Sequence, residues 1–187
     1  MTTLQARVEA VCLSIPGVRV AKAPQDEAFI GPHGLVGDRH EAEFRRLYGR
    51  LVPNQRQWSA VSTEEVQSLC ADLGVPPFAI GDLGENLRFS GVVLADVPNG
   101  SLIEFPSGAK LTVSGQNVPC INAAIALASV YGANIKETFV RSAYGRRGLV
   151  GTVLEPGLVR KGEIAQIVLA GRAKQAANKD SSQRVLL

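Results

Sequence analysis

Short apolar runs separated by turn-forming residues fill the middle of the chain and constrain its fold most strongly. From Ile80 to Gly115, β-branched and other apolar residues come in small groups, and glycine, asparagine or proline interrupts each group. Short β-branched runs bounded by such residues are typical of strands joined by tight turns. We therefore expect a β-barrel or a β-meander in this region.

Further strands are predicted on both sides of this region. Residues 7–22 alternate in places and are broken by Pro16-Gly17, which predicts two short strands joined by a turn. Residues 58–61 predict another strand. Residues 149–154 and 164–169 are also strand-like, and the turn residues of EPGLVRKGE separate them.

A helix is predicted directly after residues 58–61. Ser62 and Glu65 match a capping box, and Gly74 suits the helix end. Cys70 lies on the apolar face of this helix, so we interpret it as a core residue. Cys12, inside a predicted strand, is interpreted in the same way.

A segment rich in glycine and charge occupies residues 30–54. Its first half predicts an ordered loop over a site, and EAEFRRLYGR at residues 41–50 is interpreted as a helical turn.

Length and composition indicate one globular domain. A chain of 187 residues has the size of an ordinary domain, and 45% hydrophobic with 20% charged residues fits a compact core. We expect a mainly β fold with a few helices (α+β) over residues 1–170. Residues 171–187 lose periodicity and become polar, which predicts a frayed tail or a segment that contacts a partner.

Charge and cysteine content argue against several classes of protein. Lys and Arg number 20 against 17 acidic residues, and a net charge of +3 is too small to indicate a nucleic-acid partner. The three cysteines show neither a disulfide framework nor zinc-binding spacing. The N-terminus lacks a signal-peptide pattern, and no apolar run reaches the roughly 18 residues of a membrane span. We expect a cytoplasmic protein with no nucleic-acid or membrane partner.

Cys120 is the strongest candidate for a reactive residue. It follows Pro119 and precedes an alanine-rich helix with Asn122 as the predicted N-cap and Gly132 after the predicted last turn. Helix N-termini carry a partial positive charge, and cysteines placed there often have lowered pKa values. A thiolate at this position would be available for attack or for metal binding. The alternative is an inert cysteine packed beneath the helix.

An arginine-rich segment follows at residues 141–148. RSAYGRRG places three arginines and two glycines in eight residues, which suits a phosphate or another oxyanion. The alternative is a solvated turn whose charges serve only solubility.

Two glycine-rich loops carry further polar candidates. GLVGDRH at residues 34–40 contains Asp38 and His40, which either orient a ligand or hold the loop by hydrogen bonds. GDLGENL at residues 81–87 contains Glu85 and Asn86, which either pin the turn or contact a ligand. Both alternatives stay open from these residues alone.

Taken in order, these segments resemble the MOSC family, named after the molybdenum cofactor sulfurase C-terminal domain. The resemblance rests on GLVGDRH from Gly34, NQRQWSAVSTEE from Asn54, GDLGENLRFSG from Gly81, VPNG from Val97, VPC ending at Cys120, and YGRRGLVGTVLEPGLVRKGE from Tyr144. It runs from about Val11 to Leu169 and so covers nearly the whole chain.

The resemblance implies a MOSC-type β-barrel in which Cys120 is the catalytic residue and the metal ligand. In the family this cysteine is thought to ligate molybdenum in a pterin-bound cofactor or to receive sulfur as a persulfide. Arginines would bind the phosphate of molybdopterin, and Asn86 or backbone groups would bind the pterin. The candidate residues around the molybdenum cofactor are Asp38, His40, Glu85, Asn86, Arg146, Arg147 and Gly148.

The chain also departs from the family pattern. Lys161-Gly162-Glu163 stands where a Gly-Asp pair is usual, and the pyridoxal-phosphate domain of the larger fused members is missing. We therefore expect no pyridoxal phosphate and no cysteine desulfurase activity on this chain alone.

Three functions are compatible with these features. The leading one is reduction of N-hydroxylated small molecules at Cys120-bound molybdenum, with electrons from a separate electron-transfer protein. The second is a sulfur carrier that takes a persulfide from a separate cysteine desulfurase and delivers sulfur to an acceptor such as a metal-sulfur cofactor. Residues 141–147 would then be the docking surface. The third is an adaptor barrel with an inert Cys120.

Overall fold

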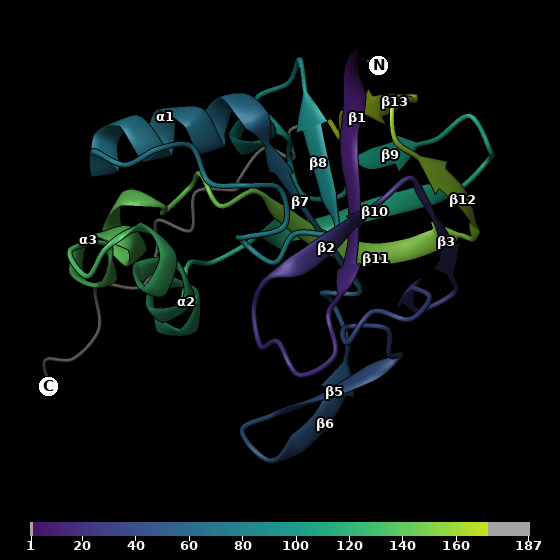
Figure 1. Ribbon diagram of the computed structural model, residues 1–187. Helices are drawn as coiled ribbons and strands as arrows, with labels where there is room; N and C mark the ends of the chain where they lie inside the picture. The colour runs from purple at the N-terminus through teal and green to yellow at the C-terminus, as the bar shows by residue number, and fades with distance from the viewer. Residues whose placement is uncertain (1, 172–187) are drawn as a thin grey trace, which may run out of the picture.

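A closed β-barrel forms the centre of the molecule. The computed structural model describes residues 2–171, and Figure 1 shows the barrel with the α-helices gathered on one side. Seven strands close in the order β13-β9-β10-β11-β7-β8-β1, because β1 also pairs with β13. All barrel pairs are antiparallel except β7 with β8. The strands are β1 (Thr3–Ser14), β7 (Trp58–Ser62), β8 (Leu87–Ser90), β9 (Leu102–Glu104), β10 (Lys110–Gln116), β11 (Leu149–Glu155) and β13 (Ile164–Val168). The prediction of a mainly β, barrel-like fold is confirmed.

Strand β1 connects the barrel to its surroundings. Its first part pairs with β13, its middle with β8 and its end with β2 (Lys22–Gln25). The register of the β1–β8 pair shifts between Val8 and Ala10. Such a bulge bends a strand, which lets β1 pair with different strands along its length. The predicted turn at Pro16-Gly17 lies in the loop between β1 and β2.

The segment interpreted as a helical turn is a β-hairpin instead. β5 (Phe44–Leu47) pairs with β6 (Arg50–Pro53), and the hairpin projects from the body of the molecule (Figure 1). Tyr48 and Gly49 have φ values of 49° and 78°. Type I′ two-residue hairpin turns have positive φ at both positions, which matches the strand twist. The helical prediction was wrong because this turn overrides the helix propensity of the Glu, Ala, Leu and Arg residues around it.

A small second sheet contains a strand that the sequence does not indicate. Its order is β12 (Gly157–Arg160), β3 (Glu27–Gly31) and β4 (Gly34–Leu35). The segment EPGLVRKGE predicts only turns, yet its centre forms β12. The partner β3 lies far earlier in the chain, so local turn residues carry no sign of this pairing.

Within residues 2–171, three α-helices and a short 3-10 helix complete the fold. They are α1 (Thr63–Leu73), η1 (Leu94–Asp96), α2 (Ile121–Tyr131) and α3 (Ile135–Ser142). Helix α1 ends at Gly74 as predicted, in the left-handed conformation with φ 67°. Half of the predicted capping box forms, because Ser62 Oγ accepts from the Glu65 N–H at 3.3 Å. The Glu65 carboxylate instead accepts from the N–H groups of Leu94 and Ala95 and so joins α1 to η1.

Replacing Ser62 with alanine is expected to lower the free energy of unfolding by about 1 kcal/mol, because an N-cap hydrogen bond is lost. Urea denaturation followed by circular dichroism measures this change. Gln67→Ala, at an exposed position of the same helix, is the control and should change stability by only a few tenths of a kcal/mol. Equal losses in both variants would contradict the capping role.

Two apolar cores hold the fold together. One fills the barrel and includes Trp58 and Phe89, and the other lies between the helices and includes Leu69 and Phe139. Cys12 and Cys70 are buried and free, which confirms their interpretation as core residues. Burial raises the pKa of the Cys12 thiol to about 12, so this cysteine is unreactive at neutral pH.

Two sequence predictions concern the ends and the surface of the chain. The polar tail predicted for residues 171–187 lies, apart from Gly171, outside the described residues. Within residues 2–171, no helix is both long enough and apolar enough to span a membrane.

Candidate functional site

A cavity of about 200 Å³ opens beside Cys120. Its walls come from segments far apart in the chain, including the loop before β2, the start of β7 and the residues before α2 and β11. Among the described residues of this wall none is acidic, and four are arginines. The cavity therefore favours an anionic ligand. The lining residues are Arg19, Val20, Arg39, His40, Arg56, Ser59, Leu83, Gly84, Asn117, Cys120, Asn122, Arg147 and Val150.

Cys120 occupies the N-cap position of α2. Its backbone is extended (φ −135°, ψ 157°), and its carbonyl oxygen accepts the helical hydrogen bond of the Ala124 N–H at 3.2 Å. The side chain makes no capping hydrogen bond, so Sγ is available to a ligand. Cys120 is the exposed one of the three cysteines. The N-cap is thus Cys120 itself, and the prediction of Asn122 as the cap was wrong by two positions.

Arg147 lies beside the thiol. Its Nη1 lies 3.8 Å from Cys120 Sγ and donates to the Val118 carbonyl at 2.7 Å, while Nη2 donates to the Leu83 carbonyl at 3.4 Å. Its buried Nε has no hydrogen-bond partner in the described part of the chain. Burial lowers the pKa of Arg147 and the neighbouring Cys120 opposes that shift, yet arginine remains a cation at neutral pH. Arg147 can therefore stabilise negative charge on the sulfur or on a ligand.

Arg56 brings a second cation to the same place. Its Nη2 donates to Asn117 Oδ1 at 2.7 Å, and Arg147 Nη1 lies 3.5 Å from that oxygen. Burial lowers the pKa of Arg56, and the positive charge of Arg147 lowers it further. Two cations that repel each other around one amide gain energy when an anion binds between them.

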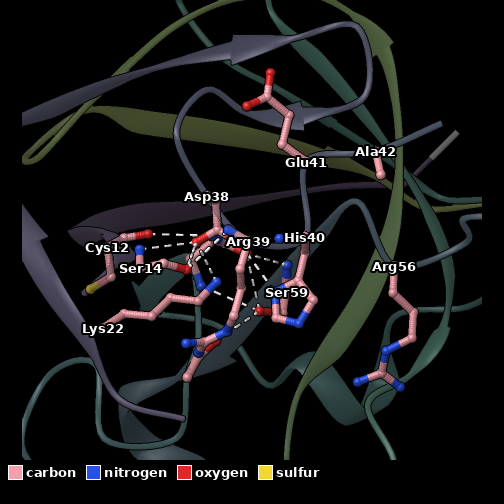
Figure 2. Close-up of polar contacts among 12 residues, drawn as sticks. Cys12, Ser14, Lys22, Asp38, Arg39, His40, Glu41, Ala42, Arg56 and Ser59 are labelled. Atoms are coloured by element: carbon pink, nitrogen blue, oxygen red, sulfur yellow. Dashed lines mark hydrogen bonds and ion pairs between the residues drawn. The ribbon is translucent and has the colours of Figure 1, made fainter. Parts of the chain in front are cut away.

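Asp38 organises the loop beneath the cavity and does not line the cavity itself. Figure 2 shows Ser14, Lys22 and His40 converging on its buried carboxylate. Oδ2 lies 2.8 Å from Lys22 Nζ and accepts from Ser14 Oγ at 2.9 Å. Oδ1 accepts from the His40 N–H at 3.0 Å and lies 3.2 Å from His40 Nδ1. Of the predicted pair in GLVGDRH, the structure therefore places His40 at the cavity and Asp38 behind it.

The charge state of Asp38 makes the fold sensitive to acid. Burial by itself would raise the pKa of this carboxyl, but the hydrogen bonds of His40 and the charge of Lys22 hold the pKa well below its ordinary value. A carboxyl with a lowered pKa in the folded state stabilises the fold above its unfolded pKa of about 4. That contribution is lost as pH falls from there through the folded pKa.

We expect the urea midpoint of the wild type to fall steadily as pH is lowered from about 5 to about 3. Asp38→Asn removes this titration, so its midpoint should be lower at neutral pH and should change less with pH. Equal pH dependence in the two proteins would show that Asp38 does not cause the acid sensitivity.

Arg39 fixes the wall of the cavity formed by the loop between β1 and β2. Its N–H donates to Ser14 Oγ at 3.1 Å, Nη1 donates to the Val18 carbonyl at 2.8 Å, and Nη2 donates to the Val20 carbonyl. This clamp places Arg19 and Val20 beside the cavity.

Glu85 and Asn86 lie behind the cavity wall as supports. Glu85 Oε1 lies 2.8 Å from Arg88 Nη2 and accepts from the Gly81 N–H at 2.9 Å. The Asn86 side chain accepts from the Ser59 N–H at 3.1 Å and donates to the Cys12 carbonyl at 3.2 Å. Both side chains are buried and neither lines the cavity.

Arg146 and Gly148 flank Arg147 in the sequence but do not line the cavity. Arg146 Nη1 forms an ion pair with Asp72 of α1 at 2.6 Å, and its Nη2 donates to the Ser142 carbonyl at 2.7 Å. Gly148 is buried with φ 81°, and its carbonyl accepts from the Asn117 N–H at 2.8 Å. The structure thus brings His40, Arg147 and Cys120 to one cavity and leaves the other predicted residues around it.

Several residues of the cavity were not singled out from the sequence. Arg39 and Arg56 stand inside the motifs GLVGDRH and NQRQW, so their positions in these motifs were an available signal. Arg19 lies in none of these motifs, and Asn117 directly precedes the motif VPC without belonging to it. Only the fold places these two residues at the cavity. The added lining residues with polar side chains are Arg19, Arg39, Arg56, Ser59, Asn117 and Asn122.

The barrel agrees with the comparison to known proteins. The family model of the MOSC domain matches residues 40–166. The chain belongs to the MOSC family. YuaD of Bacillus subtilis (strain 168), whose name connects it with metal-sulfur cluster biosynthesis, is 37% identical over 147 residues, which cover 72% of this chain and 76% of YuaD.

Solved structures show the same MOSC fold. The crystal structure of YuaD from Bacillus subtilis matches with a TM-score of 0.87 and 30% identity over 91% of this chain and 99% of that chain. YiiM from Geobacillus stearothermophilus has a TM-score of 0.65 at 19% identity, over 91% of this chain and 78% of that chain. YiiM from Escherichia coli has a TM-score of 0.60 at 19% identity, over 91% and 71%. At these identities the two YiiM structures show the fold alone.

Proposed function

We propose that this MOSC protein binds the molybdenum cofactor, with Cys120 as a molybdenum ligand and the arginines of the cavity as partners of the cofactor phosphate. The observation that carries the proposal is an exposed thiol 3.8 Å from a buried guanidinium, in a cavity lined by four arginines. Thiolates are soft metal ligands, and guanidinium groups bind phosphate through paired hydrogen bonds. One cavity thus offers partners for both ends of such a cofactor.

The residues present fit this group chemically. The buried Nε of Arg147 lacks a hydrogen-bond partner among residues 2–171, so a bound oxyanion would supply one. His40 uses Nδ1 for Asp38, which leaves Nε2 for a ligand. Asn122 and Asn117 add amide groups suited to a polar ring.

The side chains of the cavity would have distinct tasks. When bound, the cofactor supplies two-electron exchange with a small molecule, such as an N-hydroxylated compound. Cys120 would hold the metal, and Arg147 would stabilise the negative charge of the sulfur. His40, positioned by Asp38, would exchange a proton at the rim through Nε2. Buried Leu83 and Val150 would exclude water from the inner wall.

The exposure of the thiol favours a second function, that of a sulfur carrier. Val118 and Ile121, on either side of the Pro-Cys pair, are 58% and 51% exposed, so a partner protein can approach Cys120. The Cys120 thiolate would attack the outer sulfur of a donor persulfide, and the donor would leave as a thiolate. The name of YuaD, which connects that relative with metal-sulfur cluster biosynthesis, is consistent with such sulfur handling.

The two functions predict different atoms on the purified protein. The chain is purified from cells that make the cofactor, as wild type, Cys120→Ser and the control Cys70→Ser. Molybdenum is measured by elemental analysis and added sulfur by intact mass under non-reducing conditions. Cys70 is buried and its Sγ accepts from the Phe78 N–H, a contact that serine retains, so this control should load like wild type.

Molybdenum present in wild type and Cys70→Ser but lost from Cys120→Ser would support the cofactor proposal. A sulfur adduct that dithiothreitol removes and that Cys120→Ser lacks would support the carrier. Molybdenum retained by Cys120→Ser would contradict the metal-ligand role. If wild type carries neither, while other molybdenum proteins of the same cells are loaded, both functions are contradicted.

A further inference from the structure

An apolar groove of about 370 Å³ adjoins the Cys120 cavity and has no task in either function above. One wall is the loop at residues 18–21, and the other is the outward side of α2. Arg19, Val20 and Asn122 line both the groove and the cavity, so the two spaces are contiguous. The groove residues are Val18, Arg19, Val20, Ala21, Asn122, Ile125, Ala126, Ser129 and Val130.

Helix α2 is apolar on both sides. Ala123, Ala124 and Leu127 face the helical core, whereas Ile125 and Val130 on the outward side are 49% and 69% exposed. A surface helix ordinarily carries polar residues on its outward side. Apolar residues that instead line a concave surface are typical of a ligand site.

Both walls of the groove are held in place. Helix α2 packs into the helical core, and the Arg39 guanidinium donates to the Val18 and Val20 carbonyls of the opposite loop. The groove is therefore formed before a ligand arrives, as small-molecule sites usually are.

We propose that this groove binds the apolar body of a small organic substrate whose polar reacting end lies in the Cys120 cavity. This inference rests on the proposed function, because it assigns the groove to the substrate of that site. The volume falls within the roughly 300–1,000 Å³ of small-molecule pockets. The polarity of the surface changes along its length, from the apolar side chains of α2 to the arginines around Cys120. A ligand with one apolar and one polar or acidic end matches this change.

The groove can be tested on the full chain without molybdenum or persulfide. The reduced protein is treated with N-methyl-, N-butyl- and N-hexylmaleimide, and labelling of Cys120 is followed by intact mass. Rates are divided by those of N-acetylcysteine with the same reagents, and Cys120→Ser shows any labelling at other sites. Because methylenes that enter an apolar groove leave water, the corrected rate should rise roughly tenfold or more from methyl to hexyl.

Neutral substitutions separate the groove from the thiol. Ile125→Gln/Val130→Gln should reduce the hexyl-to-methyl rate ratio by at least about threefold and leave the N-methylmaleimide rate unchanged. The control Val140→Gln changes a residue of α3 that is 38% exposed and outside the groove, and it should keep the wild-type ratio.

A hexyl-to-methyl rate ratio near one in the wild type would contradict substrate binding in the groove. Molybdenum or sulfur loading through Cys120 would still be decided by its own test. A dimer in native mass spectrometry that the double variant dissociates would also overturn the proposal, because the groove would then be an interface between two copies. If Cys120 carries neither molybdenum nor sulfur but the hexyl-to-methyl rate ratio is high, the proposed function is refuted and the apolar site beside the thiol remains.

Discussion

Gly148→Ala is expected to lower the free energy of unfolding by about 4 kcal/mol or more, which is a large part of the stability of an ordinary domain. A Cβ at this position would lie 1.8 Å from the Ala60 carbonyl oxygen and 3.0 Å from Val61 Cα. Both atoms belong to the backbone of barrel strand β7 and cannot move without breaking its pairing with β11. The φ of 81° adds strain for any residue with a Cβ. Urea denaturation measures the loss. Failure to obtain folded protein would mean that the loss exceeds the stability of the fold.

Gly145→Ala is the matched control for this effect. Gly145 has a similar φ of 76°, but nothing lies within 4 Å of a Cβ built there. It should therefore lose only the roughly 1–2 kcal/mol of the left-handed conformation. The difference between the two variants isolates the clash with Ala60. Equal losses would show that strand β7 yields and that the close approach is not a constraint.

Asp38→Ala is expected to lower the free energy of unfolding by about 3–5 kcal/mol, because it leaves the fully buried ammonium of Lys22 without its counter-charge. The same change removes the acceptor of Ser14 Oγ and of the His40 N–H. We therefore also expect faster labelling of the loop that carries Arg39 and His40 in hydrogen exchange. Chemical denaturation at pH 7 measures the stability change.

Two further variants test the cause. Asp72→Ala breaks a more exposed ion pair with Arg146 and should lose no more than about 1 kcal/mol. Lys22→Met combined with Asp38→Ala should recover part of the loss, because no unpaired charge then stays buried. If the double variant is as unstable as the sum of both single variants, the buried charge is not the reason for the loss.

Elements with a local signal were the ones that the sequence predicted. The strands at residues 58–61, 149–154 and 164–169 correspond to β7, β11 and β13, and α1 ends at Gly74 as expected. Their boundaries depend on nearby side chains, such as the Ser62 oxygen at the N-cap. Strand β12 was missed because its partner β3 lies far earlier in the chain. The β5–β6 hairpin is local but was also missed, because only the two-residue turn at Tyr48-Gly49 marks it.

In the candidate site, too, the sequence predicted what nearby residues determine and missed what distant residues determine. Cys120 could be selected from its place between a proline and a helix, because a helix N-terminus is a local feature. Its neighbours could not be selected in this way. Arg56 and Arg147 are far apart in the chain and meet through Asn117 where β7 pairs with β11. Arg146 and Arg147 are adjacent in sequence, yet their guanidinium groups bind partners in different parts of the fold. Arg146 binds Asp72 on α1, and Arg147 binds the Val118 carbonyl beside the thiol.

The sequence by itself determined a mainly β fold, the start and end of α1, and Cys120 as the thiol before a helix. These depend on interactions between residues close in the chain. Only the tertiary structure decided which polar residues reach the cavity. The buried carboxylates of Asp38 and Glu85 are held by cations, whereas Arg56 and Arg147 are left facing the thiol without a carboxylate among the described residues. The physical reason is that burial and charge pairing depend on distances in space, which the closure of the barrel sets and the order of residues does not.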